Sequence, residues 1–224
     1  MRRILLIAVL LAGCAPAPPR APVSAPAPDN AASWYRQAEA AGGKVLVIDP
    51  ARSLITVTVR RGGALARLGH DHVVASRTVT GFAAPAEGRA DFSFRLDQMT
   101  VDEPALRVEA GLDTQPSEDA IAGTRTNMLT RVLEADRFPV AAMHVQQLKG
   151  NATAFRMTLT LHGVTREAIV PASIVSGADG VTAAGTFTLA QSDFGITPMS
   201  IMAGAMTVQD RMELRFQIVA RAPR

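Results

Sequence analysis

The chain has 224 residues, of which 48% are hydrophobic and only 4% aromatic, and this length suffices for one domain with a full core. Its 23 Lys and Arg against 20 Asp and Glu give a formal net charge of +3, scattered without a basic cluster, which argues against nucleic acid or an anionic membrane surface as a partner. The single cysteine excludes a disulfide framework or a thiolate metal cluster within one chain.

The first residues have the features of a secretory signal. Arg2 and Arg3 precede an apolar run over residues 4–11, which is too short to span a bilayer. The Leu-Ala-Gly-Cys segment ending at Cys14 resembles the lipobox of bacterial lipoproteins, in which the cysteine is acylated, for example with palmitate, and becomes the new N-terminus. An ordinary signal peptide with a chance cysteine is the alternative. We expect a lipoprotein signal over residues 1–13 and a periplasmic protein anchored by its lipid, and the Ala after the cysteine indicates the outer membrane.

Residues 14–44 are expected to form a tether followed by a possible short helix. Residues 15–28 are nearly all Ala or Pro, a composition that buries too little surface to fold and favours extended conformations. Residues 29–41 can form one helix, which Trp34 and Tyr35 would dock onto the domain.

A globular domain over residues 45–222 follows, and its dominant pattern is the two-residue period of half-buried strands. In the segment from Phe155 to Leu161 the apolar side chains alternate with Arg and Thr, and Gly163 then turns the chain. Such strands indicate an antiparallel barrel or sandwich. We predict strands over residues 45–49, 53–60, 73–82, 91–96, 106–114, 140–148, 154–162, 167–175, 181–191 and 206–220.

One helix is predicted among these strands, over about residues 117–133, lying against or across the barrel. Ser117 can cap its N-terminus, and the two acidic residues after it suit the positive end of the helix. Pro139 forbids its continuation. The expected apolar stripe consists of Ile121, Met128, Leu129 and Val132.

Enzyme motifs are absent from the sequence: it has no Gly-x-Ser-x-Gly, no phosphate-binding Gly-rich loop, no His-Glu-x-x-His and no Cys-x-x-Cys. We therefore expect neither an enzyme nor a bound cofactor. His70 and His72 alternate along one segment and could ligate a metal, but a closed site needs about four ligands. The interpretation that competes with a metal is a hydrogen-bonded loop at the barrel rim, and no metal is predicted.

Two segments carry a family resemblance. Residues 159–166, Leu-Thr-Leu-His-Gly-Val-Thr-Arg, and residues 192–196, Ser-Asp-Phe-Gly-Ile, resemble the YceI-like family of bacterial envelope proteins. The resemblance covers most of residues 45–220. Further segments that fit in the same order are Val47-Ile48-Asp49 followed by Ser53, Gly81-Phe82, and Asp136-Arg137-Phe138-Pro139.

The resemblance implies an all-β, antiparallel, lipocalin-like barrel that holds an isoprenoid-type lipid, polyprenyl or quinone-like, in its lumen. The alternative is a non-catalytic envelope stress or interaction module whose barrel is packed shut. Met199, Met202 and Met206 fit either core packing or a thioether-rich wall. The expected lumen residues are Phe92, Phe94, Phe155, Met157, Leu159, Leu161, Phe187, Leu189, Met212, Leu214 and Phe216.

The polar mouth of the lumen is expected to differ from that of other family members. Arg52 stands where the family usually has His, and residues 125–129 read Arg-Thr-Asn-Met-Leu where it often has Arg-Asp-x-His-Leu. A Gly-His-Asp-His segment over residues 69–72 marks a variant branch. The candidates for contacts with a polar headgroup are His70, His72, Arg125 and Ser53.

Overall fold

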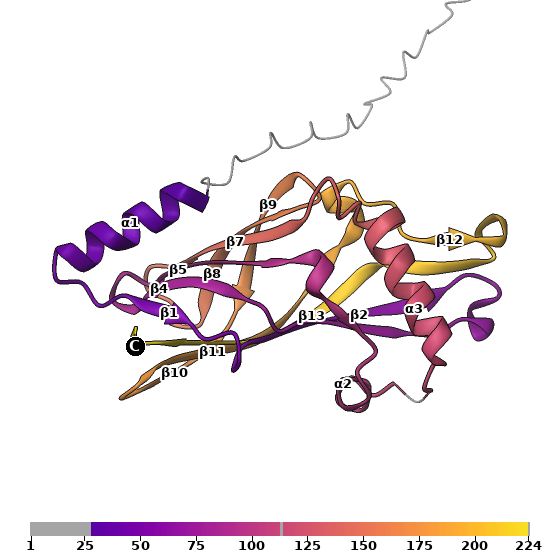
Figure 1. The fold of residues 1–224 in the computed structure, drawn as a ribbon, viewed down its shortest axis with the longest axis horizontal. Helices are drawn as coiled ribbons and strands as arrows, with labels where there is room; N and C mark the ends of the chain where they lie inside the picture. Colours follow the sequence, from indigo (N-terminus) through magenta and orange to yellow (C-terminus); the bar gives the residue numbers. More distant parts are fainter. Residues whose placement is uncertain (1–27, 113, 224) are drawn as a thin grey trace, which may run out of the picture.

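The computed structural model describes residues 28–112 and 114–223, and side chains from residue 31 onward, so the expected signal, Cys14 and most of the tether lie outside the described residues. Figure 1 shows an elongated, strongly curved sheet with helices against its outside and across one part of it. The strands are β1 (Leu46–Ile48), β2 (Leu54–Gly62), β3 (His72–Ser76), β4 (Thr80–Ala84), β5 (Arg89–Arg95), β6 (Thr100–Val101), β7 (Val140–Gln147), β8 (Ala154–Leu161), β9 (Val164–Pro171), β10 (Ser173–Gly177), β11 (Gly180–Ala190), β12 (Ser200–Ile201) and β13 (Met206–Arg221). The α-helices are α1 (Pro28–Ala40), α2 (Pro104–Glu109) and α3 (Glu118–Asn127).

All ladders between these strands are antiparallel, and they form one 13-stranded sheet. One path of neighbours runs from β13 through β1, β4, β5, β7 and β8 to β9. The chain then continues from β9 through Ala172 into β10, which pairs with β11, and β11 pairs with β13 along its length. Within the described residues no ladder joins β9 to β11, so the sheet is barrel-like without full closure. The predicted all-β antiparallel fold is confirmed.

The corner between β9 and β10 depends on Pro171, Ala172 and Gly185. Pro171 has no N–H to donate, and the Ala172 N–H donates instead to the Thr153 carbonyl at 2.9 Å. Gly185 of β11 lies so close that a Cβ there would be 2.3 Å from the Pro171 carbonyl oxygen and 2.8 Å from the Phe216 ring. A glycine is therefore needed where β11 passes the corner.

The hairpin between β8 and β9 is a two-residue turn, as the sequence predicts. His162 and Gly163 both have positive φ, +53° and +72°, which is typical of the turns that match the twist of antiparallel strands. A Cβ on Gly163 would lie 2.7 Å from the Phe138 ring, so the residue before Pro139 packs directly on this turn.

The predicted interrupting helix is present. The Ser117 hydroxyl accepts a hydrogen bond from the Ala120 N–H, and α3 continues as a π-helical turn over Met128–Val132. The whole predicted stripe packs against the barrel core, together with Leu133. The helix lies beside the half of the sheet that carries β2 and β12 (Figure 1).

Three predicted strands differ from the structure, and one of them, residues 167–175, is divided between β9 and β10 at Ala172. Residues 73–82 are divided between β3 and β4, and residues 106–114 do not form a strand because α2 occupies their first part. The alternation of Leu106, Val108 and Ala110 imitates a strand, but Pro104 begins a short helix in which Val108 is 78% exposed. Leu106 instead packs outside the sheet with Val73 and Ala75.

The predicted docking of the N-terminal helix is also present. Tyr35 is 2% exposed, stacks on Phe82 and donates a hydrogen bond to the Asp91 carboxylate at 2.8 Å. Arg89 lies over the Trp34 ring and also binds Asp91. Among the helices of the described chain, none combines the length and apolarity needed to cross a bilayer.

We predict that Gly185→Ala lowers the free energy of unfolding by about 1–3 kcal/mol, because the added methyl overlaps backbone that cannot move away easily. The matched control is Gly177→Ala, where nothing lies within 4 Å of the added Cβ. Urea unfolding of both variants measures the difference. Equal stability of the two would contradict the close approach of β11 to the corner.

Candidate binding cavity

A cavity of about 800 Å³ runs along the inside of the barrel-like sheet. Every strand except β6 contributes to its lining, and α3 and the π-helical turn close part of one side. At one end, the β12 end, the lining includes Leu68, His70 and Ile201. At the other, the β10 end, it includes Gly88, Ala152 and Ser176. The volume lies within the range of about 300–1,000 Å³ that is usual for small-molecule sites.

All the residues predicted for the lumen line this cavity. Several of them are only half-buried although they point inward: Phe187, Leu189, Met212, Leu214 and Phe216. Since they face the inside of the sheet, their accessible surface is the cavity wall itself. The side chains therefore do not meet across the centre, as a packed barrel would require. Contact of these residues with a ligand stays a prediction.

Two of the three methionines fit the thioether-rich wall, and the third fits neither interpretation. Met199 and Met206 line the β12 end of the cavity, where flexible thioethers adapt to irregular shapes. Met202 is 61% exposed and does not line it.

The two predicted mouth histidines are on the cavity wall at the β12 end, with rings 6.2 Å apart. His72 begins β3, and its Nδ1 lies 2.6 Å from Oδ2 of Asp102. The Asp102 side chain is completely buried, and its other oxygen accepts hydrogen bonds from the Val73 N–H and from Arg107.

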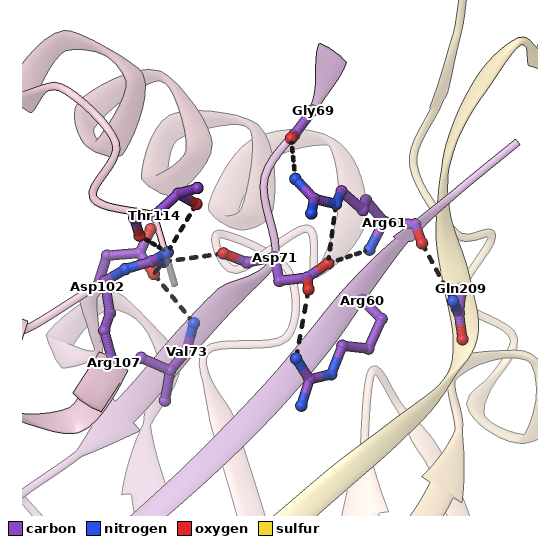
Figure 2. A network of polar contacts seen from close by, with 9 residues as sticks. All are labelled: Arg60, Arg61, Gly69, Asp71, Val73, Asp102, Arg107, Thr114 and Gln209. Carbon is purple, nitrogen blue, oxygen red and sulfur yellow. Dashed lines mark hydrogen bonds and ion pairs between the residues drawn. The ribbon is translucent and has the colours of Figure 1, made fainter. Parts of the chain in front are cut away.

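Arg107 of α2 lies beside Asp102 (Figure 2) and is 2% exposed. It donates to the Asp102 carboxylate at 2.6 Å, to the Asp71 carbonyl at 2.8 Å and to the Thr114 carbonyl. Burial would raise the pKa of Asp102, but the hydrogen bonds from His72, Val73 and Arg107 outweigh this and hold that pKa below its ordinary value. Asp102 is therefore an ionised, buried acceptor at neutral pH.

The segment that carries both histidines is fixed from its other side as well. The Asp71 carboxylate accepts hydrogen bonds from Arg60 and from the Arg61 N–H, and Arg61 donates to the Gly69 carbonyl at 2.8 Å (Figure 2). This agrees with the predicted hydrogen-bonded rim loop. Within the described residues, no cluster of three or more His, Cys, Asp or Glu is arranged to hold a metal ion.

The other two mouth candidates lie elsewhere. The Ser53 hydroxyl is buried and accepts a hydrogen bond from the Val219 N–H at 3.0 Å. This bond attaches the turn between β1 and β2 to β13. Arg125 of α3 donates to the carbonyls of Asp97 and Met99. Neither side chain lines the cavity, so the structure does not support a headgroup role for either. Both instead join elements of the wall.

Asp91 is a second buried carboxylate that the sequence did not single out. It binds Tyr35, Arg89 and, through its Oδ1, Nδ1 of His144 at 2.7 Å. His144 does not line the cavity, so this pair lies on the outer face of the sheet beneath α1. Burial opposes ionisation of Asp91, but the hydrogen bonds from His144, Arg89 and Tyr35 keep its pKa below the ordinary value.

A profile of the YceI-like domain matches residues 46–220. No curated protein matches the chain. Among solved structures, a polyisoprenoid binding domain from Saccharophagus degradans, implicated in plant cell wall breakdown, is similar over 80% of this chain and 98% of that one, with 14% identity and a TM-score of 0.56. BcnA from Burkholderia cenocepacia covers 77% of this chain and 98% of its own, with 14% identity and a TM-score of 0.52. At 14% identity, these similarities show that the two proteins share the fold of this chain.

We predict that acid weakens the fold through Asp102. Because the pKa of Asp102 is lower in the folded protein, its contribution is fully present above the unfolded value of about 3.9 and is lost as the pH falls through the folded value. Asp102→Asn should cost about 3–5 kcal/mol at neutral pH, since the buried Arg107 guanidinium loses the negative charge that compensates it. It should also lose less further stability below about pH 4 than the unmodified protein does. Urea midpoints measured against pH test this, and parallel curves for the two proteins would contradict it.

Proposed function

The chain belongs to the YceI-like family, and from that premise we propose that it is a binding protein, without catalytic activity, that holds an apolar isoprenoid-type lipid inside its barrel. We further propose that the protein is lipid-anchored through Cys14 in the periplasm, most simply at the outer membrane.

The cavity carries this proposal. Its wall consists mainly of aliphatic, thioether and aromatic side chains from nearly all strands, with polar side chains in the minority. Burial of apolar surface is worth roughly 25 cal/mol per Å², so a long hydrocarbon chain needs few polar contacts to bind tightly. A guest of this shape and chemistry fits the cavity better than a compact polar molecule does.

The structural neighbours support the same class of ligand. The similar protein from Saccharophagus degradans is a polyisoprenoid binding domain. Carried over to this chain, that supports a polyprenyl or quinone-like guest among the possible lipids. The alternative module with a packed barrel fits the open interior less well.

We predict that Leu214→Trp reduces lipid loading at least tenfold, because the larger ring projects into the middle of the cavity. The control is Arg215→Trp, which places the same ring on the exposed outer face of β13. Organic extraction of gently purified protein followed by mass spectrometry measures the lipid. Repeated recovery of empty protein with an intact Leu214, even from native membranes, would overturn the proposed function.

The proposed anchor has its own test. Cys14→Ser should abolish incorporation of labelled palmitate and move the protein from the membrane fraction to the soluble periplasmic fraction, because serine offers no thiol for acylation. Lipid loading of the barrel should persist in this variant. Continued labelling of Cys14→Ser would show that the acyl chain is attached at another residue, and it would contradict the proposed anchor.

A further inference from the structure

His72 is a polar group on the cavity wall whose orientation the surrounding protein fixes. It lies two residues before Val74 on β3, and both residues line the cavity, so the imidazole is on the inner face of the sheet. Its Nδ1 is bound to Asp102 at 2.6 Å, which sets the direction of the ring.

Three features that lower the stability of the fold surround the His72 imidazole. Asp102 has φ of +57°, in the left-handed region that residues other than glycine rarely adopt. Its carboxylate and the Arg107 guanidinium are both withdrawn from water, and a buried ion pair is seldom more stable than apolar side chains of the same volume. Nε of Arg107 is, in addition, buried without a hydrogen-bond partner among the described residues. Stability alone does not explain this arrangement.

The arrangement determines which nitrogen of His72 is available. An ionised carboxylate can only accept, so Nδ1 carries the hydrogen that Asp102 binds. In the neutral imidazole, Nε2 then carries the lone pair and acts as an acceptor. No protein atom of the described chain forms a hydrogen bond with Nε2. The cavity therefore presents a positioned acceptor at its β12 end, in a lining that also includes His70, Arg61 and Gln191.

We propose that Nε2 of His72 accepts a hydrogen bond from a hydroxyl group on the bound lipid, so that the site selects lipid alcohols and phenols, such as prenols or quinols, over esters, ethers and quinones. This inference rests on the proposed lipid-binding function. The hydroxyl end of the guest lies at the β12 end, and its hydrocarbon chain extends toward the β10 end.

The test compares geranylgeraniol with its methyl ether, which has the same chain but no hydroxyl hydrogen. Affinities are measured by displacement of a fluorescent apolar dye from the delipidated full chain. The unmodified protein should prefer the alcohol about fivefold, the ratio expected for one net hydrogen bond. His72→Phe keeps a ring of similar shape without the acceptor, and it should bind the two lipids equally.

Asp102→Asn sharpens the test. Oδ1 of Asp102 accepts from Val73 and Arg107, whereas Oδ2 faces His72, so an amide that keeps the first two bonds turns its NH₂ toward Nδ1. Nε2 then carries the hydrogen, and both an alcohol and an ether oxygen can accept it. The preference should disappear because the ether binds more tightly. A merely structural role of Asp102 would not raise the affinity for the ether.

His144→Phe is the matched control, because His144 has the same pairing with a buried aspartate but lies on the outer face of the sheet. It should retain the fivefold preference for the alcohol. Equal binding of the two lipids by the unmodified protein, or a preserved preference in His72→Phe, would overturn this inference and leave the proposed function intact. Failure of both lipids to bind the unmodified protein would overturn the two together.

Discussion

The fold depends on a curved, barrel-like sheet of antiparallel strands that encloses more space than its inward side chains fill. Main-chain hydrogen bonds along the ladders fix the spacing of neighbouring strands, and the curvature of the sheet keeps opposite walls apart. The inward positions carry Val, Leu, Ile and Met more often than aromatic residues, which make up only 4% of the chain. The interior therefore stays open while each wall is still apolar. In a domain of ordinary packing density the same residues would be a solid core.

Two buried carboxylates hold the wall together without lining the cavity. Asp91 fixes α1 to the outside of the sheet, and Asp102 with Arg107 joins β3 to α2 behind the β12 end. Both carboxylates are buried and fully hydrogen-bonded, and each engages Nδ1 of one histidine. The two pairs are chemically alike, yet one lies beneath a helix and the other borders the cavity. Position relative to the sheet decides whether such a pair is available to a guest.

The sequence predicted the inward residues well because a two-residue period depends only on neighbours along the chain. It did not predict the surroundings of His72, because Asp102 and Arg107 come from a strand end and a helix that only the tertiary fold brings together. Ser53 and Arg125 were assigned to the mouth from motif position, which carries no information about the face on which a side chain lies. The error over residues 106–114 arose because a short helix with alternating apolar residues has the pattern of a strand, although Pro104 marks its start.

Within the described chain no main-chain ladder joins β9 to β11, although both strands belong to the wall of the cavity. Separation of two strands normally breaks a row of hydrogen bonds, but widening along the line between β9 and β11 breaks none between these two strands. The corner at Pro171 and Gly185 holds one extremity of the line together. Along this line the wall therefore depends on packed side chains, Val170 and Phe187 among them, and not on a main-chain ladder.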